Sequence, residues 1–249
     1  MNKKVSIITP NYNSEKFIED SINSVISQTY ANWEMIIVDD CSSDNSRHKI
    51  LSLANKDSRI RPILLKSNVG AAEARNIALR KANGNYIAFL DSDDLWNNEK
   101  LEKQINFMIK NRVAFSFTSY NVISESGKKI RTVIKVPSKI SYSSYLKNTV
   151  IGCLTVIINR DMTGDFQFPK IKSSHDMALW LQIMKRGFLA YGLDHAYASY
   201  RIVSTSITAN KLSAAFDVWK VYRNIEGLSF LYSSYCFIHY VFNAFKKRI

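Results

Sequence analysis

Phe89-Leu-Asp-Ser-Asp-Asp-Leu-Trp96 places three carboxylates directly after a short apolar run that begins at Tyr86. The run predicts a buried strand, so the three acids crowd at the carboxyl end of that strand. Their mutual repulsion favours a bound divalent cation, because Mg²⁺ and Mn²⁺ prefer oxygen ligands and usually share their coordination sphere with substrate phosphates. The stretch therefore predicts a metal-diphosphate site built on Asp91 and Asp93.

The same acids also have a structural interpretation. Asp91 and Ser92 would then form a turn, and Asp94 would cap a helix that begins near Asn97. We favour the helix cap for Asp94. For Asp91 and Asp93 we favour metal-diphosphate binding, because several other segments of the chain agree with it.

Apolar patterns of strand and helix type alternate along the first part of the chain. Strands are expected at residues 5–9, 34–38, 60–65 and 86–90, and helices at 14–28, around 50–53 and at 70–81. Such βαβ units are right-handed and form a mainly parallel sheet, whose ligand site lies beyond the carboxyl ends of the strands. Asp39 and Asp91 follow two of these strands, so we expect both to line one crevice.

Composition limits the classes of partner. The 249 residues include 34 Lys and Arg against 21 Asp and Glu, a formal net charge of +13. This charge suits an anionic partner such as a nucleic acid, a nucleotide-sugar phosphate or an acidic membrane surface. The basic residues are dispersed and no RNA- or DNA-binding motif is present, so no nucleic-acid partner is expected.

Cysteine usage and the first residues bear on the compartment. Cys41, Cys153 and Cys236 are far apart and form no Cys-x-x-Cys pair, so neither a disulfide framework nor a zinc site is expected. The first residues lack the apolar segment and cleavage site of a secretory signal. We therefore expect a cytoplasmic protein.

The chain has no glycine-rich phosphate loop at the expected positions. No Gly-x-Gly-x-x-Gly follows the first strand and no Gly-Lys-Ser/Thr loop occurs, which argues against a dinucleotide-binding or P-loop protein. Four other segments occur instead, in this order: Val5-Ser-Ile-Ile-Thr-Pro-Asn-Tyr-Asn13, Val38-Asp-Asp-Cys-Ser-Ser-Asp44, Asn68-Val-Gly-Ala-Ala-Glu-Ala-Arg-Asn76 and Phe89-Leu-Asp-Ser-Asp-Asp94. Together they resemble the family 2 glycosyltransferases. The resemblance implies the α/β GT-A fold, with a Rossmann-like nucleotide-sugar-binding sheet, an acceptor half and, usually, a uridine diphosphate donor.

The resemblance also assigns roles in the donor half. Tyr12 would lie against the uracil ring near Pro10, and Asp39 would accept a hydrogen bond from the uracil imide. Asp91 would lie near the ribose and the metal, and Asp93 would coordinate the Mg²⁺ or Mn²⁺ that bridges the diphosphate. The structural alternative for Tyr12 is packing on the edge of the sheet.

Two further residues of these motifs are open to structural interpretations. We expect Asp40 to cap the turn that follows it rather than to bind a ligand. Arg75 is left between two interpretations, a contact with the diphosphate and an ion pair with Asp39 or Asp40.

The acceptor half is expected to depart from βαβ order. A helix after Asn97 is followed by strands at 113–118, 120–124 and 130–136, with a hairpin turn at 126–128, then by a strand at 154–158 and a helix at 177–184. His175-Asp176 precedes that helix and resembles the acidic base motif of the family, which makes Asp176 the general base. A helix cap is the alternative for Asp176, and His175 is open between ligand contact and packing. By resemblance, Arg201 is a candidate phosphate contact.

The last part of the chain reads as a helix with two different faces. Residues 228–245 contain no Asp, Glu, Lys or Arg, and a polar stripe opposes a broad apolar and aromatic face. The stripe comprises Ser229, Ser233, Cys236, Tyr240, Asn243 and Lys247. A helix in a membrane interface and a helix packed on the catalytic domain or a second subunit both fit this pattern.

These observations predict a GT-A catalytic domain at 1–207, with a nucleotide-sugar-binding half at 1–97 and an acceptor half at 98–207, and a helical extension at 208–249. The expected reaction is inverting, metal-dependent transfer of a hexose or N-acetylhexosamine from a UDP-sugar to a lipid-linked or oligosaccharide acceptor. By analogy it would serve bacterial surface polysaccharide synthesis, such as that of O antigen, at the inner face of the cell membrane. Membrane contact and homo-oligomers are left open. The alternatives are a sugar-nucleotide nucleotidyltransferase and a noncatalytic nucleotide-sugar-binding protein.

Overall fold

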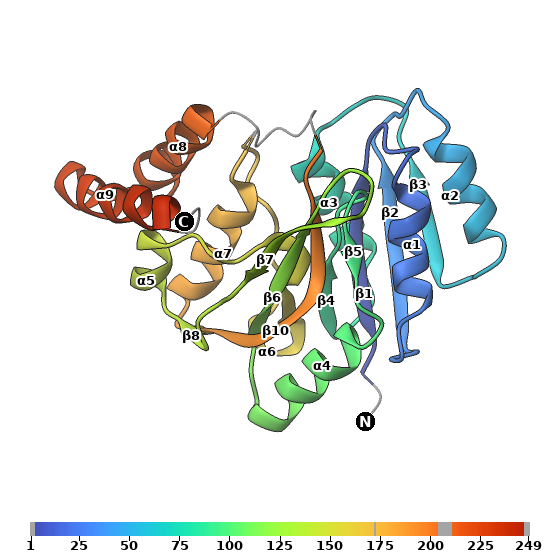
Figure 1. Cartoon of the computed structure of the whole chain (residues 1–249), viewed down its shortest axis with the longest axis horizontal. Coiled ribbons are helices and arrows are strands. Elements are labelled where there is room, and N and C mark those ends of the chain that lie inside the picture. The colour runs from blue at the N-terminus through green and yellow to red at the C-terminus, as the bar shows by residue number, and fades with distance from the viewer. Residues whose placement is uncertain (1–2, 172, 204–210, 247–249) are drawn as a thin grey trace.

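One mixed sheet organises the molecule. The computed structural model describes residues 3–171, 173–203 and 211–246. Within these residues ten strands pair in the order β3-β2-β1-β4-β9-β6-β10-β5, with β7 beside β6 and β8 beside β10 (Figure 1). Two buried apolar clusters pack against the sheet.

The first half is built as predicted. Its strands are β1 (Val5–Asn11), β2 (Trp33–Asp39), β3 (Ile60–Leu64) and β4 (Tyr86–Phe89), and its helices are α1 (Ile18–Ile26), α2 (Ser46–Ala54) and α3 (Ala71–Lys81). All of the ladders among these four strands are parallel. The first helix begins later than expected, because the carbonyl of Ser14 accepts hydrogen bonds from the amides of Phe17 and Ile18 in a turn.

Strand register brings the carboxyl ends of the strands together. Asn11 pairs with Asp39 across β1 and β2, and the amide of Leu90 donates to the carbonyl of Ile8 at 3.1 Å. Asp39 and the acids after Leu90 therefore lie along one edge of the sheet, as the alternation of strands and helices predicted.

The second half departs from βαβ order. Its elements are β5 (Leu95–Trp96), α4 (Lys100–Asn111), β6 (Phe115–Ile123), β7 (Lys129–Ile134), β8 (Lys139–Ile140), α5 (Tyr142–Lys147), η1 (Cys153–Thr155), β9 (Ile157–Asn159), α6 (Arg160–Thr163), α7 (His175–Lys185) and β10 (Ala190–Arg201). The hairpin of β6 and β7 is confirmed, with Gly127 at φ 80° in its turn. The two strands expected at 113–118 and 120–124 are a single strand, β6. The strand expected at 154–158 begins instead as a 3₁₀ turn, and β9 follows it.

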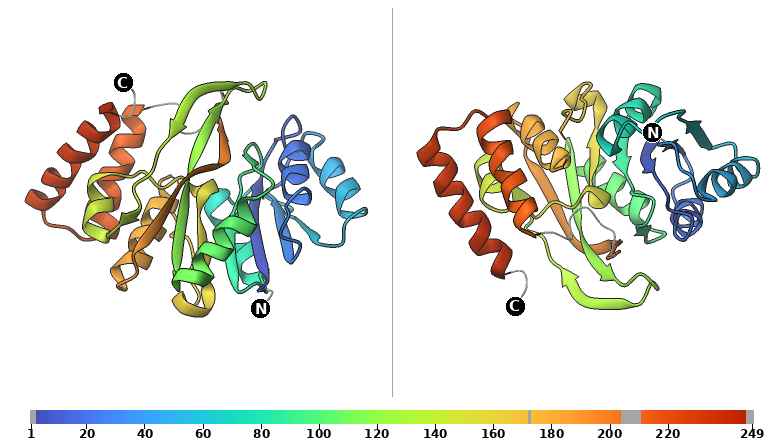
Figure 2. Two further views of the ribbon diagram at one scale, coloured as in Figure 1. Left: turned by 60° about the horizontal axis from the view of Figure 1, so that its bottom comes forward. Right: turned by 90° about the horizontal axis from the view of Figure 1, so that it is seen from above.

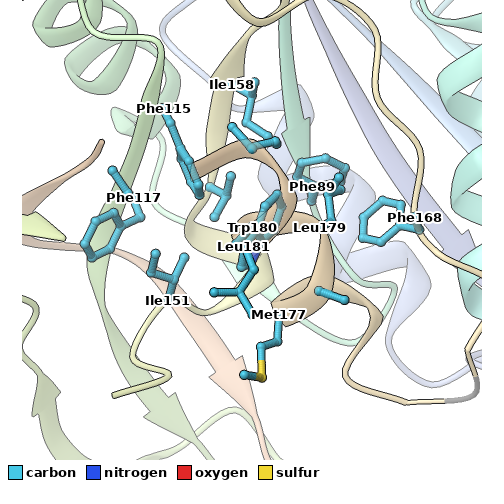
Figure 3. Packing of buried hydrophobic residues seen from close by; sticks show 14 of the residues in the cluster. Phe89, Phe115, Phe117, Ile151, Ile158, Phe168, Met177, Leu179, Trp180 and Leu181 are labelled. Atoms are coloured by element: carbon cyan, nitrogen blue, oxygen red, sulfur yellow. The ribbon is translucent and has the colours of Figure 1, made fainter. Parts of the chain in front are cut away.

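Aromatic packing joins the two halves. Trp180 of α7 lies 5.4 Å from Phe89 of β4 and 5.3 Å from Phe115 of β6, measured between ring centroids (Figure 3). Phe168 approaches Phe89 at 5.4 Å and is tied to α3, because the side chain of Asn76 exchanges two hydrogen bonds with its backbone. This cluster holds the start of α7 close to the segment that follows β4.

The carboxyl-terminal helices form the end of the molecule remote from β3. α8 (Lys211–Lys220), η3 (Val221–Ile225) and α9 (Phe230–Lys246) follow β10, and α9 lies outermost (Figures 1 and 2). Ser233 and Cys236 of the predicted polar stripe are fully buried, so α9 packs on the protein through that stripe. Within the described ranges, no helix is both long and apolar enough to cross a bilayer. The predicted boundary at 207/208 and Lys247 of the stripe lie outside the described residues.

Candidate active site

Asp39 lies in a dense hydrogen-bond network at the end of β2. Its Oδ1 accepts hydrogen bonds from the amide of Ser42 (3.1 Å) and from Nε of Arg47 (2.5 Å), and its Oδ2 accepts one from Asn11 (2.8 Å). Burial alone would raise the pKa of Asp39, but the hydrogen bonds from Ser42, Arg47 and Asn11 lower it below its ordinary value. Asp39 is therefore a fixed anion. Sequence analysis missed Arg47, which lies on α2 beyond the recognised motif.

Pro10 and Tyr12 flank the same edge. Tyr12 follows β1 and 53% of its surface is exposed, so packing on the sheet edge leaves much of the ring open to a planar ligand. Asp40 is not available to a ligand in the same way. Its two carboxylate oxygens accept hydrogen bonds from the amides of Val69 (2.7 Å) and Gly70 (2.8 Å). Asp40 is a structural residue, as expected, although it caps the entry to α3 and not the turn that directly follows it.

Arg75 connects the two halves of the site. One of its guanidinium nitrogens, Nη2, donates to Asp91 Oδ1, and Nη1 lies 2.6 Å from Nε2 of His175. Burial alone would lower the pKa of Arg75, but the charge and hydrogen bond of Asp91 and the charge of Asp176 raise it above its ordinary value. Arg75 thus pairs with Asp91, and not with Asp39 or Asp40, which were the partners considered from the sequence.

The contact with Arg75 fixes the protonation of His175. A guanidinium can only donate, so His175 Nε2 must accept and the imidazole proton must be on Nδ1. Burial and the neighbouring charge of Arg75 lower the pKa of His175 to about 4. His175 Nδ1 is buried without a hydrogen-bond partner among the described residues. The neutral ring therefore presents a buried donor beside the acids.

Asp93 and Asp94 carry the excess negative charge of the site. Burial and the charge of Asp91 raise the pKa of Asp93 to about 6, and burial and the charge of Asp93 raise the pKa of Asp94 well above its usual range. The cap predicted for Asp94 is wrong: α4 begins at Lys100, and Asp94 Oδ1 accepts the amide of Arg201 at 2.8 Å. Asp94 ties β10 to the segment between β4 and β5 that carries Asp91, Asp93 and Asp94, which we call the acidic loop.

Arg201 lies at the end of β10 with its guanidinium buried. Its Nε donates to the carbonyl of Asp93 at 2.7 Å and its Nη1 donates to the carbonyl of Glu125 at 2.8 Å. Its described contacts brace the backbone of the acidic loop. The phosphate contact expected from the sequence stays a prediction.

Asp176 enters the same site from α7. It lies in the first turn of that helix, and its Oδ1 accepts the amide of Met177 at 2.8 Å. The charge of Asp176 helps to raise the pKa of Arg75 and acts against the lowering of the His175 pKa, so its carboxylate lies near both side chains. Arg75 thus links Asp91 after β4 to His175 in the first turn of α7, which also carries Asp176 and is far from β4 in the chain. Cys153, which sequence analysis did not single out, lies close enough for its thiol to interact with Arg75.

The acidic loop suits a divalent cation that a substrate helps to bind. Across the part of the chain that the structure describes, no three His, Cys, Asp or Glu side chains converge as a preformed metal cage. Mg²⁺ and Mn²⁺ commonly need only one or two protein carboxylates when phosphates supply further oxygens. Asp93, whose pKa is raised because its charge is poorly compensated, is the kind of carboxylate that a cation would stabilise.

The sequence matches a known family and is similar to named glycosyltransferases. Residues 6–166 match the model of "Glycosyl transferase family 2". The chain is 49% identical over 245 residues to the putative teichuronic acid biosynthesis glycosyltransferase TuaG of Bacillus subtilis, covering 98% of this chain and 97% of the relative. It is 44% identical over 218 residues to UDP-Glc:alpha-D-GlcNAc-diphosphoundecaprenol beta-1,3-glucosyltransferase WfgD of Escherichia coli, covering 87% and 84%.

Solved structures share the fold. S. aureus TarS 1-349, in complex with UDP-GlcNAc, superposes with a TM-score of 0.76 at 22% identity, covering 98% of this chain and 73% of TarS 1-349. Mannosyltransferase PcManGT from Pyrobaculum calidifontis, in complex with GDP-Man and Mn²⁺, gives a TM-score of 0.72 at 18% identity, covering 91% and 65%. The mixed α/β sheet is thus of the GT-A type. With the family match, this decides against the nucleotidyltransferase and noncatalytic alternatives. The chain belongs to glycosyl transferase family 2 and is a glycosyltransferase.

Proposed function

We propose that this glycosyltransferase moves a hexose or N-acetylhexosamine from a UDP-sugar to a lipid-linked saccharide, with inversion and with the help of Mg²⁺ or Mn²⁺. The observation that carries the proposal is the meeting of two kinds of carboxylate in one site. Asp91 and Asp93 follow β4, and Asp176 lies in the first turn of α7, which Arg75 connects to Asp91 through its contact with His175. One group suits the leaving diphosphate, and the other suits the attacking hydroxyl.

The donor half would hold the nucleotide. Tyr12 beside Pro10 would contact the uracil ring, and Asp39 would accept from the uracil imide. Arg47 and Asn11 already hold the Asp39 carboxylate in one orientation. A carboxylate oriented before binding loses less freedom when it meets the base.

Asp93, with Asp91, would hold the divalent cation. When bound, that ion supplies positive charge that stabilises the negative charge developing on the leaving diphosphate. Arg75 positions Asp91, and Arg201 braces the loop through the Asp93 carbonyl. The buried Nδ1–H of His175 would donate to an oxygen of a bound substrate, since a buried donor is stabilised by a partner.

Asp176 would act as the general base. It would accept the proton of the acceptor hydroxyl while that oxygen attacks the anomeric carbon from the face opposite the diphosphate. A single displacement of this kind inverts the anomeric configuration. Asp94 is less suited to the role, because it is buried with only 1% of its surface exposed, whereas Asp176 is half-buried.

The proposed acceptor follows from the relatives. WfgD is named for a diphosphoundecaprenol-linked GlcNAc acceptor, and TuaG for teichuronic acid biosynthesis. A related lipid-linked acceptor would place this chain at the inner face of the cell membrane, as a peripheral protein in surface polysaccharide synthesis.

Donor turnover tests the proposal directly. Purified protein is given UDP-glucose, UDP-GlcNAc or GDP-mannose, with Mn²⁺, with Mg²⁺ or with EDTA, and with a GlcNAc-diphospholipid acceptor. We expect turnover of one UDP-sugar, its loss in EDTA, and a product whose anomeric configuration in NMR is inverted. Preference for GDP-mannose would contradict the uridine assignment, activity in EDTA would contradict the metal, and retained configuration would contradict single displacement.

A further inference from the structure

Eight of the sixteen exposed large apolar or aromatic side chains of the described residues belong to the last helices, α8, η3 and α9. On α9, Leu231, Tyr235, Ile238 and Phe242 are all exposed, at positions i, i+4, i+7 and i+11. These spacings place them on one side of a helix. We call this set the outer stripe of α9. Leu231 is 81% exposed and Ile238 is 69% exposed, so the outer stripe is a continuous apolar strip and not the margin of a core.

The opposite side of α9 explains why the outer stripe is exposed. Ser233 and Cys236 have no exposed surface, and the side chain of Asn243 donates to the carbonyl of Lys147 on α5 at 3.0 Å. Phe237 also faces inward and meets Trp219 of α8 with ring centroids 5.5 Å apart. Small and polar residues, together with Phe237, thus make the protein contact while the apolar residues of the outer stripe face outward. A helix in water normally has the reverse arrangement.

Positive charge borders the outer stripe. Lys147 of α5 lies over the ring of Tyr235, with Nζ 4.8 Å from the ring centroid and 3.4 Å from the hydroxyl. The span Phe230–Lys246 contains no Asp or Glu, and the sequence continues with Lys247 and Arg248. Tyrosine and tryptophan rings beside cations are typical of surfaces that meet the boundary between lipid headgroups and acyl chains.

We propose that the outer stripe of α9 docks this enzyme on the surface of an anionic lipid bilayer. The proposal rests on the proposed function, since a lipid-linked acceptor is confined to such a surface. Charge favours lipid over a second copy of the chain, because pairing two copies would bring together two molecules of net charge +13. An anionic bilayer offers both an apolar layer for the exposed side chains and negative charge for Lys147.

Vesicle co-sedimentation with a matched pair of variants tests the proposal. Leu231→Gln/Ile238→Gln removes the most exposed aliphatic side chains of the outer stripe. Leu51→Gln/Met162→Gln makes the same chemical change at two exposed positions on α2 and α6. We expect the first variant to bind vesicles of phosphatidylglycerol and phosphatidylcholine at least about 10-fold more weakly than wild type, because two buried aliphatic side chains are lost from the interface. The control should stay within about 2-fold of wild type.

Further measurements separate the outcomes. Wild-type binding should weaken in pure phosphatidylcholine and at high salt, because both remove the electrostatic attraction. Equal vesicle binding by wild type and the α9 variant would overturn the proposal. So would a wild-type dimer, seen by light scattering, that the α9 variant converts to monomers. Hydrolysis of the UDP-sugar without vesicles is measured for every protein. If UDP-sugar hydrolysis persists and the α9 variant binds vesicles as wild type does, the docking proposal fails and the proposed function stands. If no protein hydrolyses a UDP-sugar but the α9 variant alone loses vesicle binding, the proposed function fails and the docking proposal stands.

Discussion

Glu34 and Asp93 lie near opposite ends of the same parallel strands, and their surroundings differ in charge. Glu34, near the start of β2, contacts Lys4 at 2.9 Å and Arg61 at 2.6 Å and accepts hydrogen bonds from Ser6 and the amide of Asn83. Burial alone would raise the pKa of Glu34, but these four partners lower it to about 2. The charge of the Glu34 carboxylate is therefore fully compensated within the protein.

Asp93 lacks this compensation. Burial and the charge of Asp91 raise its pKa to about 6, and the nearest cations are already occupied. Arg75 pairs with Asp91, and the guanidinium of Arg201 donates to two backbone carbonyls. At the amino-terminal end of the sheet the negative charge of Glu34 is thus balanced by its partners, whereas at the carboxyl end the charge of Asp93 is not. A bound cation would relieve a shortfall of this kind and could then hold a diphosphate, as the proposed function requires.

The largest test of this comparison is removal of the Asp93 carboxylate. Asp93→Ala should lower sugar transfer by about 10³-fold, because the charge that holds the metal at the leaving diphosphate is lost. Mn²⁺ with UDP should also no longer raise the melting temperature. Asp165→Ala removes an exposed acid and serves as the control. Wild-type activity of Asp93→Ala would remove the metal assignment.

The base assignment is tested by Asp176→Asn. The amide keeps the shape of the side chain but cannot accept the acceptor proton, so turnover should fall by at least about 10²-fold. A base acts only in the transition state, and calorimetric affinity for UDP with Mn²⁺ should therefore be preserved. Joint loss of affinity and turnover would place Asp176 in the donor pocket or the fold, and His175 would become the next candidate.

Glu34→Gln tests whether the balanced charges around Glu34 stabilise the fold. At neutral pH it should lower the free energy of unfolding by about 2 kcal/mol, because it leaves Lys4 and Arg61 without their buried partner. The folded-state pKa of Glu34 lies below its ordinary value of 4.5, so the stabilisation it provides is present above pH 4.5 and is lost as pH falls towards about 2.

Urea titrations of wild type and Glu34→Gln should therefore converge as the pH falls through this range. Glu73→Gln, which breaks the more exposed pair with Arg80, should cost less than about 0.5 kcal/mol. A constant difference between wild type and Glu34→Gln at all pH values would show that the loss is one of packing.

The smallest expected effect is a gain in the free energy of unfolding, where Glu34→Gln gives a loss. In metal-free protein, Asp93→Asn should raise the free energy of unfolding at pH 7 by about 1 kcal/mol, because it relieves like-charge repulsion. The pKa of Asp93 is raised, so wild type loses stability as pH rises from about 4 through about 6, and the variant does not. The gain should disappear below pH 4 in urea titrations. A loss of stability at pH 7 would mean that the carboxylate is already compensated.

Local pattern predicted the first half of the molecule well, for a physical reason. β1, β2 and β4 are buried on both faces and read as apolar runs, and the residues at the carboxyl ends of β1 to β4 must share an edge once the strands are parallel. The role of Asp94 was not predictable in this way. Its partner is the amide of Arg201, 107 positions away in the chain, and no local pattern signals a contact across that separation.

The sequence by itself determined the family, the parallel half-sheet and the acidic loop after β4, because motif order and strand period are properties of neighbouring residues. Tertiary structure alone decided that Arg75 serves Asp91 and His175, and that Arg47 holds Asp39. It also decided which side of α9 faces the protein. Helical period locates two faces but does not determine which of them packs on the protein. Here the face that carries Ser233, Cys236 and Phe237 packs against α5 and α8, and the outer stripe stays exposed.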